Sequence, residues 1–471
     1  MLKNTLEYLY SLRNQGSGYG IERMERLLSK MDSSIFSFSV VHVAGTNGKG
    51  STCAMLDSIY RENGYKVGMF SSPHLVELGE RIRVNGRILD EKDLNLHVER
   101  LKPLAEQVEN ENAGMHPTFF EFMTAIAFSV FHEQNIDLAV IETGLGGRLD
   151  STNVVNPEIS VITTISFDHC HLLGHTIEEI AREKAGIIKP GRPVLTGWLS
   201  TEANELIKKI ADQKGANFHT LANHSLKQSL PETNLHGSYQ KKNAALALKA
   251  SEIITAKVPT LRKLSKRALM KVQLEGRWQI LGQHPTVVMD ACHNEEGAKV
   301  LIENIESLPK DKDLVLWFGS LGKDRAVEVL RKISRFAVQI KFFECQQPRS
   351  CSFEELVSFL PKDYKGSIDF GRVSEANKYL SSVDHDKIIL ITGGVQGIGL
   401  KCAERFLSLG SKVIITCKSQ TSYEHFKKSS LERNIQLEKL DLTNEISIDM
   451  LHKKLDKLDI LINNATILKG G

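Results

Sequence analysis

The sequence lacks the cysteine patterns of disulfide frameworks and of zinc sites. Its seven cysteines are scattered over 471 residues, and no two of them form a Cys-x-x-Cys pair. A disulfide-stapled fold or a structural zinc site requires paired or clustered cysteines. We therefore expect reduced thiols and a cytoplasmic protein.

Long apolar runs and a large net charge are also missing. No apolar stretch reaches the ~20 residues that cross a bilayer. The first residues, MLKNTLEYL, carry polar and acidic side chains where a secretory segment has an apolar core. The 60 lysines and arginines nearly balance the 57 acidic residues, which argues against nucleic acid or a membrane as the main partner. We expect a monomer with small-molecule substrates that are attracted by local charge.

The sequence does contain repeated alternation of strand and helix patterns, which predicts an α/β fold with mainly parallel sheets. Strand-like runs occur at 66–70, 137–141, 159–164 and 193–195, and again at 286–290, 314–318, 339–343 and 367–370. The pattern restarts at 387 with an apolar run at 388–392 and another at 412–416. There is no low-complexity linker and no repeat of 20–50 residues. We predict three domains, at 1–274, 275–386 and 387–471.

A glycine-rich loop between an apolar strand pattern at 38–43 and a helix pattern at 53–60 predicts a phosphate site. Backbone N–H groups of such a loop and the following helix N-terminus can bind an anion. The eight loop residues are Gly45, Thr46, Asn47, Gly48, Lys49, Gly50, Ser51 and Thr52. Val43 and Gly50 stand where an ordinary P-loop has Gly and Ser or Thr, so this is a different type of nucleotide loop. The alternative is a solvated turn with an exposed lysine.

Polar residues follow three of the predicted strands. Ser72 comes shortly after 66–70, Glu142 directly after 137–141, and His169 soon after 159–164. The carboxyl ends of parallel strands meet at one sheet edge, where ligands bind. One hydroxyl, one carboxylate and one imidazole there would suit Mg²⁺. Taken singly, each residue has a structural alternative: a turn residue, a helix-cap acceptor and a packed histidine.

Six ordered stretches extend this interpretation to a family. The GTNGKGST loop resembles that of Mur-type ATP-dependent ligases, and the full set resembles folylpolyglutamate synthases and dihydrofolate synthases over about 1–385. The stretches are GTNGKGST (45–52), SSPHLVELGERIRVNG (71–86), PTFFEFMTAIAF (117–128), IETGLGGRLDSTN (141–153), SFDHCHLLGHTIEEIAREKAGIIKPG (166–191) and DACHN (290–294).

The resemblance implies a Mur-ligase-type P-loop domain followed by a second Rossmann-like α/β domain. It implies ATP-dependent ligation of L-glutamate to a folate carboxylate through an acyl phosphate. ATP and Mg²⁺ are the expected cofactors, and a monovalent cation is a further option. Both dihydropteroate and a reduced folate stay open as acceptors.

The resemblance also implies roles for single residues. Ser72, Glu142 and His169 match the Mg²⁺ ligands. Lys49, Lys184 and His293 are the expected catalytic residues, and Lys184 matches a lysine that the family carries carbamylated. The alternative for Lys184 is that it complements the dipole of a helix opened by the capping box TIEE at 176–179.

Further nucleotide contacts are expected from Asn243, Arg277 and Asp290. The chain departs from the family near each: Tyr239 replaces His, Glu275 replaces Pro, and Ala291-Cys292 replace Gly-Ala. Phe120 and Glu121 stand where the family contacts the pterin. The alternative is that the two aromatics of the FFE sequence belong to the core.

Residues 387–471 resemble the N-terminal half of a short-chain dehydrogenase, a truncated Rossmann-like segment. The loop TGGVQGIG at 392–399 and the LINNA sequence at 461–465 carry this resemblance, with Gly393, Gly397, Gly399 and Asn463 as its expected NADP contacts. Cys417-Lys418 follows the second strand, where an acidic residue would favour NAD, so the cofactor expected from this resemblance is NADP.

The sequence stops at Gly471 without the YxxxK segment of that family, so we expect no complete oxidoreductase. An NADP-dependent oxidoreductase, a nicotinamide-binding module and a non-catalytic assembly module stay open for this segment. Both family patterns also require the strand at 388–392, and the sequence alone does not assign it.

Overall fold

The chain divides into two compact units. In the computed structural model the described residues are 2–12, 20–75, 77–222, 230–283, 286–309, 311–344, 349–371, 387–392, 413–417 and 435–439. The first unit comprises residues 1–279 and 294–307, and the second comprises 280–293 and 308–471. The three domains inferred from the sequence stay a prediction. No helix among the described residues is long and apolar enough to cross a membrane.

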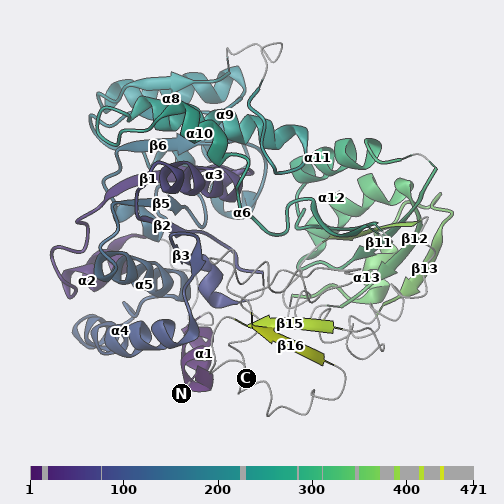
Figure 1. The fold of residues 1–471 in the computed structure, drawn as a ribbon, viewed down its shortest axis with the longest axis horizontal. Helices are drawn as coiled ribbons and strands as arrows, with labels where there is room; N and C mark the ends of the chain where they lie inside the picture. Colours follow the sequence, from purple (N-terminus) through teal and green to yellow (C-terminus); the bar gives the residue numbers. More distant parts are fainter. Residues whose placement is uncertain are drawn as a thin grey trace. The chain divides into compact units, whose positions relative to one another are not determined.

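The first unit is built on an eight-stranded sheet in the order β4-β3-β2-β5-β1-β6-β7-β8 (Figure 1). The strands are β1 (Ser39–Ala44), β2 (Val67–Phe70), β3 (Ile82–Val84), β4 (Arg87–Ile88), β5 (Leu138–Glu142), β6 (Ile159–Ile162), β7 (Val194–Thr196) and β8 (Phe218–Thr220). The neighbours β2, β5, β1, β6, β7 and β8 all pair in parallel, whereas β3 pairs antiparallel with both β2 and β4. The predicted α/β fold with a mainly parallel sheet is confirmed.

Helices cover both faces of this sheet, as expected for parallel strands, whose apolar side chains point both ways. The helices of this unit are α1 (Leu2–Ser11), α2 (Glu22–Ser29), α3 (Lys49–Glu62), α4 (Glu91–Glu111), α5 (Phe119–Glu133), α6 (Cys170–Leu173), α7 (Ile177–Ala185), α8 (Thr201–Gln213), α9 (Ser238–Ile253), α10 (Arg262–Ala268) and α11 (Glu295–Glu306), of which α1 to α5, α9 and α10 contribute to the two buried clusters on the sheet.

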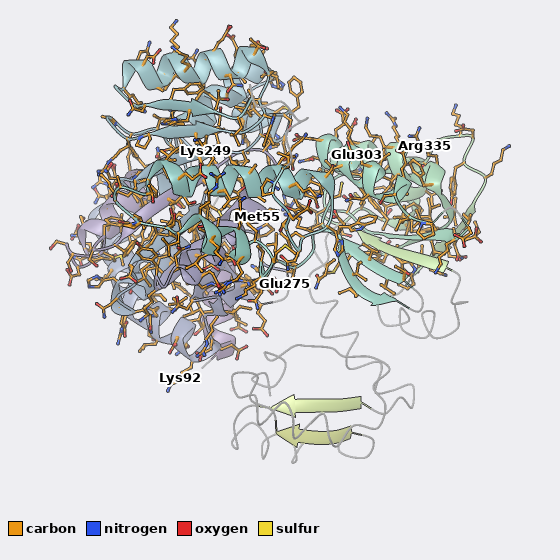
Figure 2. The ribbon with its side chains drawn as sticks, turned by 45° about the horizontal axis from the view of Figure 1, so that its top comes forward. Met55, Lys92, Lys249, Glu275, Glu303 and Arg335 are labelled. Carbon is orange, nitrogen blue, oxygen red and sulfur yellow. The ribbon has the colours of Figure 1, made fainter. Side chains whose placement is uncertain are left out.

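The side chains of β1 show how the two cores are separated. Val41 and Val43 belong to a buried cluster with residues of α3, α9 and α10. Val40 points to the other face and belongs to the cluster formed with α1, α2, α4 and α5. Figure 2 marks the first layer, where α3 carries Met55 and α9 carries Lys249. β1 therefore lies in the middle of the unit, buried between two helical layers.

The second unit contains a six-stranded sheet in the order β13-β12-β11-β14-β10-β9. Its strands are β9 (Gln279–Gln283), β10 (Thr286–Asp290), β11 (Asp313–Phe318), β12 (Ala337–Phe342), β13 (Ser367–Phe370) and β14 (Lys387–Thr392), and its helices include α12 (Lys323–Ile333) and α13 (Phe353–Ser358). Pairing from β10 through β14 and β11 to β13 is parallel.

β14 is the strand that both family patterns require. It pairs with β10 on one side and β11 on the other, with Leu390 opposite both Val288 and Leu316. The strands β15 (Val413–Cys417) and β16 (Ile435–Lys439) form a separate parallel pair. In this structure the strand therefore belongs to the ligase-type sheet. The predicted NADP contacts Gly393, Gly397, Gly399 and Asn463 lie outside the described residues.

Truncation tests this position of β14. A chain that ends at Asp386 loses a strand from the interior of the six-stranded sheet and exposes the edges of β10 and β11. We expect its second unit to lose cooperative unfolding, whereas a chain that ends at Thr392 keeps it. Calorimetric or urea unfolding of both truncated chains measures the difference. Equal unfolding midpoints for the two chains would contradict the role of β14.

Candidate functional site

The glycine-rich loop joins β1 to α3 and leaves the start of that helix without a side-chain cap. Gly48 is the N-cap residue of α3, with φ of 81°, and no side chain caps the helix there. Gly45 has φ of 152°, and an added methyl group would collide with Thr163 Oγ1. The loop therefore requires glycine at both positions. Because uncapped N–H groups and the helix dipole favour an anion, the geometry supports the predicted phosphate site.

Two lysine side chains meet at one backbone carbonyl of this loop. Lys49 Nζ donates to Gly45 O and Thr46 O, both at 3.0 Å. Lys184 Nζ, from the last turn of α7, donates to Gly45 O at 2.9 Å. Burial, followed by the nearby charge of Lys49, lowers the pKa of Lys184 to about 7. The environment of Lys184 therefore favours the neutral amine far more than water does.

α7 also shows the capping box that the sequence predicts. Thr176 and Glu179 cap the first turn reciprocally. Lys184 lies in the last turn, as the dipole interpretation requires, but it is buried rather than exposed at the helix end. Favourable interaction with a helix dipole does not require burial of the cation. The helix dipole therefore does not explain why Lys184 is buried against the Gly45 carbonyl.

The structure brings two of the three predicted metal ligands together. The buried carboxylate of Glu142, at the end of β5, accepts a hydrogen bond from Ser72 N at 3.1 Å. A methyl group added to Gly50 would lie 3.5 Å from Glu142 Oε2, so the first turn of α3 faces this carboxylate. Burial raises the pKa of Glu142, and the charge of Lys49 opposes that shift. A bound cation would favour the ionised carboxylate for the same reason.

His169 lies on a segment that is attached to the phosphate loop. Its backbone is left-handed, with φ of 51°, and its Nε2 lies 3.8 Å from Asp168 Oδ1. Upstream, Thr46 Oγ1 donates to Ser166 O at 3.1 Å, and Asn47 N donates to Thr164 Oγ1 at 3.0 Å. The hydroxyl of Ser72 and the carboxylate of Glu142 are oxygen donors that suit a hard divalent cation, with water and phosphate oxygens to complete its shell. His169 stays a prediction as the third ligand. Across the residues with described positions, no group of three or more His, Cys, Asp or Glu side chains could hold a metal by itself.

The predicted nucleotide contacts are divided between the two units. Asn243 is buried on α9, and a methyl group on Gly48 would lie 2.7 Å from its Oδ1, so it borders the loop. Arg277 is close enough to Glu142 for its charge to lower the pKa of that carboxyl. In the second unit, Asp290 accepts from Cys292 N at 2.8 Å, and His293 Nδ1 lies 2.9 Å from Ala291 O.

The two predicted pterin contacts have different environments. Glu121 is buried, caps α5 reciprocally with Thr118, and accepts from Arg23 Nε at 3.0 and 3.2 Å. Its carboxylate therefore helps to hold α2 against α5. The ring of Phe120 packs against Phe70 and occupies the space where Gly144 would carry a side chain. Phe120 thus lies beside the loop that follows Glu142. Both residues stay predictions as substrate contacts.

The site also contains residues that sequence reasoning missed. Asn294 and Glu296, at the start of α11, contact Asn47 of the phosphate loop. Asn294 is the last residue of the DACHN stretch and Glu296 lies two residues beyond it, which is the only local signal for either. Thr163 Oγ1 donates to Asn47 O at 2.6 Å, and in the sequence it is simply part of the apolar strand run at 159–164.

Comparison with known proteins gives two family matches and several close relatives. Residues 43–263 match the Mur ligase middle domain, and residues 387–471 match the short chain dehydrogenase family. The chain is 36% identical over 362 residues to the dihydrofolate synthase/folylpolyglutamate synthase of Bacillus subtilis, covering 72% of this chain and 84% of that protein.

Solved structures of folylpolyglutamate synthases and dihydrofolate synthases are also similar to this chain. E. coli FolC in complex with DHPP and ADP has a TM-score of 0.72 and 27% identity, covering 86% of this chain and 97% of that one. A bifunctional folylpolyglutamate synthase/dihydrofolate synthase with Mn, AMPPNP and L-glutamate bound has a TM-score of 0.72 and 25% identity, covering 86% of this chain and 98% of that one.

The low pKa of Lys184 predicts a specific pH dependence of stability. Between about pH 7 and its ordinary pKa of about 10.4, Lys184 binds a proton in the unfolded chain but not in the folded chain. Folding is therefore penalised most below pH 7, and stability rises with pH across this window, by up to about 1.4 kcal/mol per pH unit. We expect Lys184→Met to raise the free energy of unfolding most at pH 6 to 7, with the gain shrinking toward pH 10.

Urea unfolding at several pH values measures this difference. Lys208→Met is the matched control, because Lys208 is exposed and pairs only weakly with Asp212. A gain for Lys184→Met that does not change with pH would contradict the assignment.

Proposed function

The chain belongs to the dihydrofolate synthase/folylpolyglutamate synthase family, and we propose that it ligates L-glutamate to a folate carboxylate at the expense of ATP. The resemblance inferred from the six motifs is confirmed by the match to the B. subtilis enzyme over 84% of its length. The observation that carries the proposal is the phosphate loop with Lys49 and Lys184 at the Gly45 carbonyl. Dihydropteroate and a reduced folate are both acceptors to be tested.

The chemistry explains why such a loop is needed. A carboxylate is a poor acyl donor at neutral pH, so phosphoryl transfer from ATP must first convert it to an acyl phosphate. The amino group of glutamate then attacks the acyl carbon, phosphate leaves, and an amide remains. Lys49 and the uncapped start of α3 are the groups that would bind the phosphoryl oxygens.

Ser72, Glu142 and His169 are the residues that would hold Mg²⁺. The cation supplies neutralisation of charge on the phosphoryl group when it is bound. Glu142 would contribute a carboxylate that is already buried and oriented by the Ser72 N–H. The nucleotide contacts of Asn243, Arg277, Asp290 and His293 are part of the same proposal.

We also propose that Lys184 carries a carbamate, and its environment supports this modification. Its lone pair can attack CO₂ only when the amine is neutral; the N–C bond then forms, the amine proton leaves, and a carbamate anion remains. The structure gives this lysine both burial and a pKa of about 7. The product would place a negative charge beside Lys49, where protonated Lys184 has a positive one, so attraction would replace repulsion between the two side chains.

Phosphate release provides the direct test of the ligase. With ATP, Mg²⁺ and L-glutamate present, we expect turnover on dihydropteroate, on a reduced folate or on both. Lys49→Ala removes the side chain proposed to bind phosphoryl oxygens, so we expect kcat/KM to fall by about 100-fold or more. No turnover of the wild-type chain on either acceptor, or full activity of Lys49→Ala, would refute the proposal.

A second measurement tests the carbamate. Lys184→Arg keeps a positive charge but cannot form the modification, so we expect loss of ligase activity with nucleotide binding retained. The wild-type chain in ¹³C-labelled bicarbonate should show a carbamate signal by ¹³C NMR that is missing from Lys184→Arg. An active Lys184→Arg chain, or the same spectrum for both chains, would count against the carbamate.

A further inference from the structure

We propose that Glu296 is a positioning residue, which fixes Asn47 of the phosphate loop against residues 164–166 and so sets the geometry in which nucleotide phosphates bind. Glu296 lies in the first turn of α11, within the same unit as the loop. This inference rests on the proposed function, because it assigns Glu296 to the ATP site of that reaction. Glu296 lies outside the six family stretches and is not among the predicted ligands.

One carboxylate oxygen of Glu296 collects donors from two separate segments. Oε2 accepts from Asn47 Nδ2 at 2.5 Å and from Ser166 Oγ at 2.6 Å. Thr164 Oγ1 lies 3.4 Å from the same oxygen. Glu296 therefore ties the phosphate loop to the segment that leads from β6 to His169.

Asn294 makes a second, parallel connection. Its side chain caps α11 by accepting from Gly297 N at 2.8 Å. It also exchanges hydrogen bonds with Asn47, donating at 3.0 Å and accepting at 3.3 Å, and it donates to Asp168 Oδ2 at 3.2 Å. With Glu296 and Asn294 both in contact, the amide of Asn47 has one orientation that satisfies all its partners. The side chain next to Gly48 is thereby held in place.

The competing explanation is that Glu296 only complements the dipole of α11. Acidic residues in a first turn do this without any specific partner. Glu295, its neighbour, lies in the same turn and pairs with Lys299 at 3.2 Å. The dipole explanation requires only a negative charge at position 296. The positioning explanation requires a side chain long enough to place an acceptor oxygen beside Asn47 and Ser166.

Three substitutions separate these explanations. Glu296→Gln keeps the length and an acceptor oxygen but loses the charge. Glu296→Asp keeps the charge but is one methylene too short to reach Asn47 and Ser166. Glu296→Ala loses both. We expect the Kd for ADP and for a non-hydrolysable ATP analogue, measured by calorimetry on the full chain, to rise about tenfold for Asp and Ala and less than about threefold for Gln.

Direct nucleotide binding keeps this test separate from the ligase reaction. If the wild-type chain binds nucleotide but turns over no folate, the proposed function fails while the positioning role is still measured. Ser166→Ala removes one donor and leaves Glu296 intact, so it should weaken binding in the same direction by a smaller factor. Glu306→Ala, an exposed change on the same helix, is the control and should leave the Kd unchanged.

The relative Kd values of the three Glu296 variants decide between positioning and a dipole effect. Binding restored by Asp but not by Gln would overturn the proposal in favour of a charge or dipole effect. Equal Kd values for all three variants would overturn it as well. A double-mutant cycle of Glu296→Gln and Glu296→Ala against Asn47→Ala adds an independent criterion, because positioning requires that the cost of Glu296→Ala largely disappears once Asn47 is absent.

Discussion

The carbonyl oxygen of Gly45 accepts hydrogen bonds from two lysine amines, and most properties of the site follow from that arrangement. Lys49 and Lys184 come from different helices and meet where β1 ends. Two ammonium groups at one acceptor repel each other, and one of them is buried. The strain can be relieved by loss of a proton from Lys184, by an anion at the loop, or by conversion of Lys184 to an anion. Each of these belongs to the proposed chemistry.

The sheet order makes this meeting possible. β1 lies between β5 and β6, and the register sets Val43 opposite Glu142 and Ala44 opposite Ile162. The first residues beyond the strands therefore reach the same edge, with Glu142 on one side of the loop and Thr163 on the other. Thr163 occupies the space a side chain at Gly45 would need. The loop sequence and the register of the neighbouring strands constrain each other.

The sequence predicted those features that depend on local patterns. The strand runs, the loop and the capping box at Thr176 need only periodicity and a few signature residues, and each occurs in the structure. The approach of Ser72 to Glu142 was predictable because parallel strands share an edge. Glu296 was not, because 249 residues separate it from Asn47 and no periodicity encodes that contact. For Glu121 the sequence predicted a substrate contact from the motif alone. It did not predict that Arg23 and the N-cap of α5 bind the same carboxylate.

The position of β14 has a consequence for the C-terminal segment. The match to short chain dehydrogenases begins at residue 387, so it uses β14 as its first strand. In the structure both edges of that strand are hydrogen-bonded, to β10 and to β11, while β15 pairs with β16. A strand has only two edges, so β14 cannot join β15 without leaving one of its partners. A sheet in which β14 pairs with β15 is therefore incompatible with the intact six-stranded sheet.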